Sequence, residues 1–392
     1  MKMPDNIEIR KQILKGLKRV VIKIGSSVIS NRKKDKAGLA CGLCQETIQI
    51  LARKINLILK NKCKVTLVSS GAIMAGRNRL GLDRPHLTIP EKQACAAVGQ
   101  SFLVRSYEKA FDKYGVKVAQ ILLDHQDLVS RKRYLNAKNT LDTLMSHNVV
   151  PIVNENDTVS VDEIKIGDND TLSADVACLL DAQLLIILSD VEGLFTGDPT
   201  KPTRYNQKHE LIPLVTQITP ELEHLAGNST NQLTVGGMEA KVRAAKKTMS
   251  FGIPTLIISG IDLNQLPKVF EGKSIGTLFW AEKTNIKNRK HWIAHTLKPA
   301  GGVVIDSGAK KALLDNGKSL LPAGVIRVEG EFQFGNAVCV YDDSMNELAR
   351  GLINYNSVEL NRIKGMKTQA ARKMMGEGFY DEVIHRDDLV VS

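Results

Sequence analysis

The chain has 392 residues, of which 43% are hydrophobic and 24% charged, and its formal net charge is +12. This composition excludes a largely disordered protein, and the length favours two domains over one. No apolar run is long enough to span a bilayer, and the beginning, MKMPDNIEIRKQ, lacks the apolar stretch of a secretory signal, so we expect a cytoplasmic protein. The positive charge is consistent with an anionic partner, such as a nucleotide, RNA or an acidic metabolite, and equally with a compositional bias of the organism.

Short apolar segments alternate with amphipathic ones through most of the chain. We expect strands at 19–24, 64–69, 116–123, 149–153, 184–188 and 255–258. Helices are expected between them at 39–59, 91–111, 134–147 and 236–251. Strands this apolar, separated by helices, indicate a parallel sheet that is covered on both faces. We therefore predict an α/β fold, a three-layer αβα sandwich with a mainly parallel central sheet, which binds its ligands beyond the carboxyl ends of the strands.

The character of the chain changes after Trp280. Residues 283–291 (KTNIKNRKH) are polar and basic, and from Ala300 onward short β-like segments are separated by Gly and Asp-Asp turns. We place the first domain at 1–285, a linker at 286–298 and a small, mostly β domain at 299–392.

Several common signatures are absent. The six cysteines do not form paired metal-binding spacings, and buried, reduced thiols best explain the lone C-x-x-C of Cys41 and Cys44. The pattern G-x-x-x-x-G-K-[ST] does not occur, and no G-x-G-x-x-G follows the first strand. A dinucleotide-dependent dehydrogenase is therefore poorly supported.

Two lysines stand beside glycines where a phosphate could bind. Lys23 is near the end of the first strand and is followed by Gly25 and two serines. Lys241 lies within the first turns of the helix that Gly236 and Gly237 open. Glycine permits close approach of the backbone, and the free N–H groups of a helix start attract anions. Taken singly, each lysine could equally be a surface residue beside a flexible turn.

Small and acidic or amide residues follow other expected strands. Ser70 precedes Gly71 after the second strand, where free N–H groups could bind a carboxylate or the serine could cap a helix. The segment 154–157 (NEND) follows the strand at 149–153, and 167–170 (GDND) lies beyond it. Together these two segments could hold the ammonium and the α-carboxylate of an amino acid, although Asn and Asp also suit purely local turns.

The strand at 184–188 leads into Ser189, Asp190 and a turn that contains Gly193. A nucleotide could lie beside this segment. A turn rich in Gly, Asp and Pro is the alternative interpretation.

Taken in order, these elements resemble the amino acid kinase family. The matching segments are VIKIGSSVI, VSSGAIMAG, AAVGQS, PIVNENDTV, IKIGDNDTLSA, LSDVEGLFTGDP and GGMEAK. NEND together with GDND is typical of the members that phosphorylate glutamate. The segments 305–309 (IDSGA) and 319–324 (SLLPAG) resemble a PUA domain.

The resemblance implies ATP-dependent phosphorylation of the γ-carboxylate of L-glutamate to γ-glutamyl phosphate, the first step of proline biosynthesis. It implies ATP and Mg²⁺ as cofactors and no metal-ligating protein residues. The implied catalytic residues are Lys23, Lys241 and Asp170. The implied ATP-binding residues are Lys23, Ser189, Asp190, Val235, Gly236, Gly237, Met238, Glu239, Ala240 and Lys241. The implied substrate-binding residues are Ser70, Asp157, Asn169, Asn154 and Asp168.

The family pattern has threonine where Val235 and Ala240 stand, so we expect weaker ATP binding than in a typical member. The resemblance also implies a homo-oligomer, feedback inhibition by proline, and functional coupling to γ-glutamyl phosphate reductase. Two alternatives stay open. One is a related kinase with another acceptor, such as aspartate or N-acetylglutamate, and the other is RNA binding through the PUA-like domain.

Overall fold

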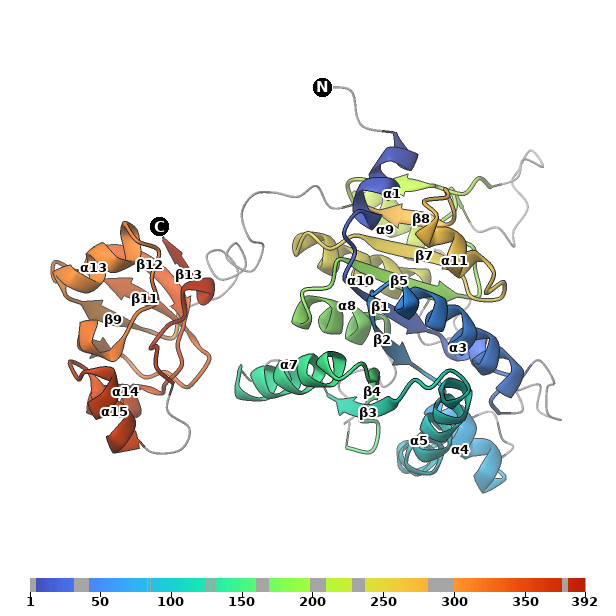
Figure 1. Cartoon of the computed structure of the whole chain (residues 1–392), viewed down its shortest axis with the longest axis horizontal. Coiled ribbons are helices and arrows are strands. Elements are labelled where there is room, and N and C mark those ends of the chain that lie inside the picture. The colour runs from blue at the N-terminus through green and yellow to red at the C-terminus, as the bar shows by residue number, and fades with distance from the viewer. Residues whose placement is uncertain are drawn as a thin grey trace. The chain divides into compact units, whose positions relative to one another are not determined.

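The computed structural model describes residues 5–31, 42–82, 84, 86–124, 127–128, 131–159, 169–197, 209–227, 237–280, 299–375 and 380–391. The chain divides into two compact units, one formed by residues 1–128 and 136–282 and the other by 129–135 and 283–392 (Figure 1). The expected linker at 286–298 lies outside the described residues. No helix in the described part of the chain combines the length and the apolar character needed to cross a membrane.

The first unit is organised around an eight-stranded sheet with the order β3-β4-β2-β1-β5-β7-β8-β6. Its strands are β1 (Arg19–Ile24), β2 (Lys64–Ser69), β3 (Val118–Leu123), β4 (Val150–Glu155), β5 (Leu184–Ser189), β6 (Leu214–Val215), β7 (Thr255–Ser259) and β8 (Thr277–Phe279). All neighbours pair in parallel except β7 and β8, which are antiparallel. The prediction of a mainly parallel sheet is therefore confirmed.

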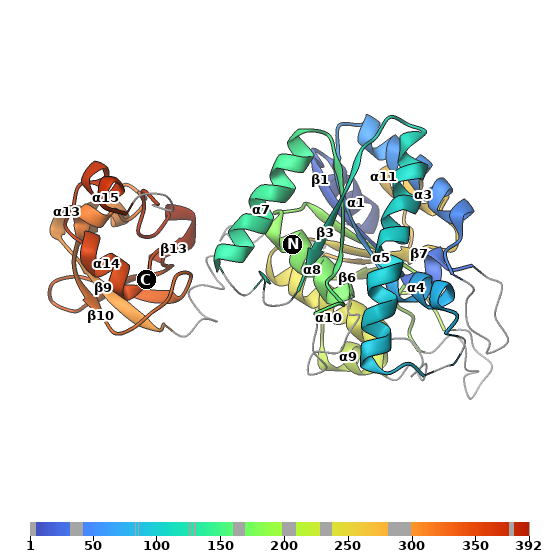
Figure 2. The same ribbon diagram turned by 90° about the horizontal axis from the view of Figure 1, so that it is seen from below.

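Helices cover both faces of this sheet. They are α1 (Asn6–Leu14), α2 (Ser26–Ile29), α3 (Gln45–Lys60), α4 (Ala72–Leu80), α5 (Ile89–Asp112), α7 (Arg131–Ser146), α8 (Asn169–Leu179), α9 (Pro220–Gly227), α10 (Met238–Ser250) and α11 (Gln265–Phe270). Figures 1 and 2 show α3 and α11 on one side of the sheet and α8 and α10 on the other. Buried residues of α3, α5 and α11 form one core with alternate residues of the strands, among them Ile22 and Ile24 of β1. Because side chains alternate along a strand, Lys23 points to the opposite face, where α8 and α10 lie.

The expected helix at 39–59 begins later than predicted, at Gln45. Leu43 forms an isolated antiparallel bridge with Ser30, so the chain is extended immediately before the helix. Residues 32–41, including Cys41, are outside the described residues. The other cysteines, Cys44, Cys63, Cys95, Cys178 and Cys339, carry free thiols, as expected.

Glycines allow α4 and α5 to pack in direct contact. A Cβ at Gly76 would lie 1.8 Å from the Cys95 carbonyl oxygen, and one at Gly99 would lie 1.8 Å from the Ala72 carbonyl oxygen. Real Cβ atoms do not approach that closely, so larger residues at either position would push the two helices apart. The N-terminus of α5 is stabilised by a capping box between Thr88 and Glu91.

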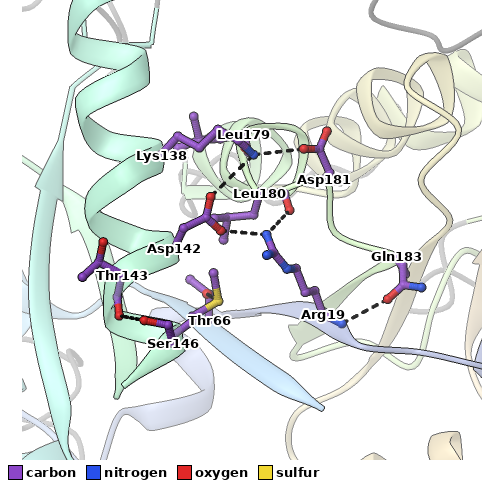
Figure 3. A network of polar contacts seen from close by, with 11 residues as sticks. Arg19, Thr66, Lys138, Asp142, Thr143, Ser146, Leu179, Leu180, Asp181 and Gln183 are labelled. Atoms are coloured by element: carbon purple, nitrogen blue, oxygen red, sulfur yellow. Dashed lines mark hydrogen bonds and ion pairs between the residues drawn. The ribbon is translucent and has the colours of Figure 1, made fainter. Parts of the chain in front are cut away.

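Polar contacts connect α7, α8 and β1 at the edge of the sheet where β1 and β5 begin (Figure 3). Arg19 donates to the Asp142 carboxylate at 2.8 Å and to the Leu180 carbonyl at 3.1 Å. Lys138 donates to the Leu179 carbonyl at 2.9 Å and to the Asp181 carboxylate at 3.0 Å. These cations satisfy carbonyls at the C-terminal end of α8, where the helix dipole favours positive charge. The C-terminal end of α8 is thereby held in place, and its N-terminal end carries Asn169 and Asp170.

The second unit contains a five-stranded sheet with the order β10-β9-β11-β12-β13 and its own apolar core. Its elements are β9 (Gly301–Ile305), α13 (Ser307–Leu314), η1 (Pro322–Gly324), β10 (Val325–Glu329), β11 (Ala337–Tyr341), β12 (Glu347–Leu352), α14 (Ser357–Ile363), α15 (Thr368–Met375), η2 (Arg386–Asp388) and β13 (Leu389–Val391). The short β-like segments expected after Ala300 are present as strands, among them β9 to β12. Asp306 caps α13 by accepting from the Ala309 N–H at 2.6 Å.

Candidate active site

The centre of the site is a carboxylate that contacts two ammonium groups. Lys23 Nζ lies 2.8 Å from Asp170 Oδ1, and Lys241 Nζ lies 3.3 Å from Asp170 Oδ2. Lys23 comes from β1, Asp170 from the first turn of α8, and Lys241 from the first turns of α10. The Lys23 contact is an ion pair without hydrogen-bond geometry, whereas Lys241 also donates a hydrogen bond. The structure thus brings together the three residues whose catalytic role the family resemblance implied.

This cluster is buried and carries one more positive than negative charge. The Asp170 side chain is 0% exposed and each lysine side chain 7%. Burial lowers the pKa of Lys241, the Asp170 carboxylate opposes this by raising it, and the charge of Lys23 lowers it again. Burying uncompensated charge is costly, so the cluster favours an anion as its remaining partner.

The start of α10 offers further groups to an anion. Gly237 is its N-cap and provides no side-chain cap, so the first N–H groups of the helix have no side-chain acceptor from that position. A Cβ at Gly237 would meet nothing within 4 Å, so the space around this turn is open. The Lys241 ammonium donates a hydrogen bond to the Gly237 carbonyl at 3.4 Å. The backbone N–H groups of the first turn, the positive end of the helix dipole and Lys241 together suit a phosphate group.

The segment after β5 follows the strand that neighbours β1 in the sheet. Ser189 is buried and donates to the Asp190 carboxylate at 3.1 Å, while Asp190 itself is exposed. Asp190 is close enough to Lys241 to raise the pKa of that lysine. Gly193 lies against Thr277, where a Cβ would meet Oγ1 at 2.6 Å, and the Leu194 N–H donates to the same oxygen at 2.8 Å. The turn is therefore fixed against β8, and it keeps Ser189 and Asp190 on the lysine side of the site.

Hydrogen bonds between side chains join the carboxyl ends of β2 and β4 to the start of α8. Asn169 Nδ2 donates to Ser70 Oγ at 2.8 Å and to Asn154 Oδ1 at 3.0 Å. Asn154 Nδ2 in turn donates to Gln100 Oε1 of α5 at 2.9 Å. Asn169 directly precedes Asp170, so this network is next to the charged centre. It brings together three residues expected to bind substrate, namely Ser70, Asn154 and Asn169.

Asp157 is a buried carboxyl group on the turn after β4, 8% exposed. Burial raises the pKa of Asp157 to about 7, and the negative charge of Glu155 adds to the increase. Among the described residues, Asp157 Oδ1 and Asn169 Oδ1 are buried acceptors without a hydrogen-bond partner. Two unpartnered acceptors suit a cationic donor, such as the ammonium of an amino acid.

Some expected site residues cannot be placed. Val235, Gly236 and Asp168 lie outside the described residues. Met238 is half-buried, Glu239 exposed and Ala240 buried, all in the first turn of α10. The sequence analysis gave Gln100 no role, although Gln100 stands in the segment AAVGQS that carried part of the resemblance. That segment is the signal that could have identified it.

Comparison with known proteins gives an independent view of the chain. Residues 18–259 match the model of the amino acid kinase family, and residues 301–375 match that of the PUA domain. The glutamate 5-kinase of Geobacter sulfurreducens is 48% identical over 97% of this chain and 100% of its own length. The glutamate 5-kinase of Moorella thermoacetica is 46% identical over 95% of this chain and 96% of its own. This chain belongs to the amino acid kinase family.

As an amino acid kinase with a PUA domain, the chain matches the domain order expected from its sequence. The kinase match ends at Ser259, the last residue of β7, and the PUA match begins at Gly301, at the start of β9. Solved structures of more distant proteins also align with it. A carbamate kinase from Giardia lamblia bound to AMP-PNP is 19% identical with a TM-score of 0.48, covering 68% of this chain and 99% of that chain. A UMP kinase from Bacillus anthracis is 14% identical with a TM-score of 0.44, covering 68% of this chain and 97% of that chain.

Proposed function

We propose that this amino acid kinase transfers the γ-phosphoryl group of ATP to the γ-carboxylate of L-glutamate and forms γ-glutamyl phosphate, the first step of proline biosynthesis. The observation that carries the proposal is the buried contact of Lys23 and Lys241 with Asp170 beside the network of Ser70, Asn154 and Asn169. An excess of positive charge at the ends of parallel strands suits a phosphoryl group in transfer. The adjoining amide and carboxyl groups suit an amino acid acceptor.

The transfer needs positioning and charge stabilisation more than covalent help from the protein. A γ-carboxylate is ionised at neutral pH, so it can attack phosphorus without a general base. The ammonium groups of Lys23 and Lys241 neutralise the negative charge on the phosphoryl oxygens as the bond to the leaving oxygen breaks. Asp170 acts as a positioning residue, because its two carboxylate oxygens hold the two lysines at 2.8 and 3.3 Å.

The acceptor side is assigned to the two acidic and amide-rich turns. We assign the unpartnered oxygens of Asp157 and Asn169 to the α-ammonium of glutamate. Ser70 and Asn154 hold Asn169 in place through hydrogen bonds. An acceptor whose nitrogen is acylated offers less to these two oxygens, so the arrangement favours glutamate over N-acetylglutamate.

The nucleotide side is assigned to the start of α10 and the turn after β5. Gly237, Met238, Glu239 and Ala240 offer backbone N–H groups to the phosphates, and Ser189 and Asp190 lie on the same side of the sheet. We assign Mg²⁺ to the phosphates of ATP, because this ion keeps phosphate and water ligands in preference to all-protein sites. When bound, the ion neutralises phosphate charge.

The direct test is a glutamate-dependent hydroxamate assay. The full chain is incubated with ATP, Mg²⁺, L-glutamate and hydroxylamine, which traps an acyl phosphate as its hydroxamate. We expect product that requires both ATP and glutamate and that falls to background with Lys241→Ala. If aspartate or N-acetylglutamate supports equal or faster ADP release, the proposed acceptor is wrong.

Further properties belong to the same proposal. We infer that the enzyme acts in the cytoplasm, where ATP is available, and that it forms a homo-oligomer. Proline, the end product, is proposed as its feedback inhibitor, measurable as loss of hydroxamate formation when proline is added. Because an acyl phosphate hydrolyses readily in water, we also propose functional coupling to γ-glutamyl phosphate reductase, which consumes the product.

A further inference from the structure

Gln100 is a buried polar side chain at the acceptor end of the site. It lies on α5 and is 8% exposed. Its Oε1 accepts the hydrogen bond from Asn154 Nδ2 at 2.9 Å, whereas its Nε2 is buried without a hydrogen-bond partner among the described residues. Leaving a buried donor unpaired destabilises a protein, so such an atom needs an explanation.

In the orientation that Asn154 adopts, its amide nitrogen faces Gln100, and this sets the orientation of the Gln100 amide. Asn154 uses its oxygen to accept from Asn169 Nδ2, so only its amide nitrogen remains to donate to Gln100. Gln100 must therefore present its oxygen to Asn154 and turn its N–H groups away from it. Within the part of the chain that the structure describes, the network consequently ends in an unpartnered donor at Gln100 Nε2 and an unpartnered acceptor at Asn169 Oδ1.

The unpartnered atoms complement a zwitterion. Gln100 Nε2 is a donor, while Asp157 Oδ1 and Asn169 Oδ1 are acceptors. A carboxylate accepts hydrogen bonds and an ammonium donates them, so an α-amino acid head group satisfies both kinds of atom. Hydrogen bonds link Gln100 to Asn154 and Asn154 to Asn169, which precedes Asp170, so we place Gln100 toward the end of the acceptor remote from the transferred phosphoryl group.

The position of α5 against the acceptor residues is set by a second buried contact. Tyr107 follows Gln100 by two helical turns and lies on the same buried face. Its hydroxyl is hydrogen-bonded to Ser69 Oγ at 2.8 Å, and Ser69 Oγ donates to the Ser70 carbonyl at 3.1 Å. One rigid helix therefore contacts the ends of both β2 and β4, as a site of fixed geometry requires.

We infer that Gln100 determines specificity for an α-amino acid by donating from Nε2 to the α-carboxylate of the acceptor, while its Oε1 fixes Asn154. This inference rests on the proposed function, because it names a further contact for the same glutamate. The γ-carboxylate stays with Lys23 and Lys241, and the ammonium with Asp157 and Asn169. Gln100 thus distinguishes glutamate from amines that lack an α-carboxylate.

The test compares L-glutamate with 4-aminobutanoate, which keeps the ammonium and the reacting carboxylate but lacks the α-carboxylate. Steady-state kinetics of the full chain give KM for glutamate and for ATP, and Ki for 4-aminobutanoate as a competitor of glutamate. Gln100→Glu retains an acceptor for Asn154 Nδ2, removes the donor and adds a negative charge. Gln100→Met removes both hydrogen bonds. Gln49→Met, on the exposed face of α3, is the matched control.

With Gln100→Glu we expect KM for glutamate to rise about 10- to 100-fold, the range for a lost hydrogen bond to a charged group. Ki for 4-aminobutanoate should not rise and KM for ATP should not change, whereas the melting temperature should fall because the added carboxylate is buried. Gln100→Met should raise KM for glutamate and also raise Ki for 4-aminobutanoate, because Asn154 loses its hydrogen-bond partner. Gln49→Met should leave every constant unchanged.

If Gln100→Glu raises KM for glutamate and Ki for 4-aminobutanoate by equal factors, Gln100 has a merely structural role and the inference is overturned. An unchanged KM for glutamate would overturn it as well. If Gln100→Glu fails to fold, Gln100→Met decides between the two roles. Loss of the α-carboxylate contact must then raise KM for glutamate by a larger factor than Ki for 4-aminobutanoate. Failure of the proposed function looks different, because the unaltered chain would then not phosphorylate glutamate at all.

Discussion

The Lys23 ammonium lies 2.8 Å from Asp170 Oδ1, and both side chains are almost entirely shielded from solvent. The second oxygen of the same carboxylate contacts Lys241. Since one carboxylate contacts two ammonium groups, the cluster carries a net positive charge, and a bound anion would neutralise it. Removing a lysine should therefore mainly weaken stabilisation of the bound anion. Removing Asp170 should leave the two buried lysines without their carboxylate.

Lys23→Ala and Lys241→Ala should each lower kcat on the order of 10²-fold or more, the usual cost of removing one preorganised donor from charge developing in the transition state. The hydroxamate assay at saturating substrates measures this directly. Lys246→Ala provides the control, because Lys246 is on the same helix but exposed and paired with Glu223. A loss below threefold in either lysine variant would contradict the role proposed for it.

Asp170→Asn should destabilise the fold as well as inactivate the enzyme. It leaves two buried ammonium groups without their carboxylate, and removing one partner from a buried charge pair costs about 3–5 kcal/mol. Urea unfolding at pH 7 measures the free energy. The double variant Asp170→Asn with Lys241→Met should regain part of the stability but none of the activity. Full stability in the single variant would show that Asp170 does not hold the lysines.

The pH dependence of glutamate use should reflect Asp157. Its carboxyl group has a pKa raised to about 7, so it is neutral below that pH and negative above it. Only the negative form attracts the α-ammonium, so kcat/KM for glutamate should rise roughly tenfold from pH 6 to pH 8. A coupled assay of ADP release at saturating ATP measures the profile. Asp157→Asn should lower kcat/KM and remove the rise; a rise that persists in this variant belongs to another group.

The same carboxyl group should affect stability in the opposite direction. Its folded-state pKa of about 7 is above the ordinary value of 3.8, so the folded protein binds the proton more tightly than the unfolded chain. Its contribution therefore becomes less favourable as the pH rises from about 4 to 7. Asp157→Asn should melt higher than the unaltered chain at pH 8, with a smaller difference at pH 5. Equal differences at both pH values would show that the pKa of Asp157 is not raised.

Gly76→Ala and Gly99→Ala should separate α4 from α5. Each added Cβ would lie 1.8 Å from a carbonyl oxygen of the facing helix, and overpacking of this kind costs about 1–3 kcal/mol or more. The melting temperature should therefore fall. Because α5 carries Gln100, KM for glutamate should rise as well. Gly227→Ala, where a Cβ meets nothing within 4 Å, should be tolerated. Unchanged melting in both α5-contact variants would contradict the close packing.

Parts of the fold could be predicted because their signals are local. The short apolar run of β1 identifies a buried strand, and the alternation of side chains along a strand separates Lys23 from Ile22 and Ile24. The amphipathic pattern of 91–111 likewise predicted α5, which extends from Ile89 to Asp112. By contrast, the start of α3 depended on a bridge between Leu43 and Ser30, and the antiparallel β8 depended on the order of the strands in the sheet. Neither leaves a periodic pattern in its own segment.

The sequence by itself determined which residues could form an anion site, since glycines, lysines and acidic turns at strand ends are properties of short segments. Only the tertiary structure decided that Asp170 contacts both Lys23 and Lys241, and that Gln100 faces Asn154. The physical reason is that these contacts join residues far apart along the chain. They form only when α5 packs on one face of the sheet that contains β1 and β4 and α8 and α10 pack on the other, and their distances are set by that packing.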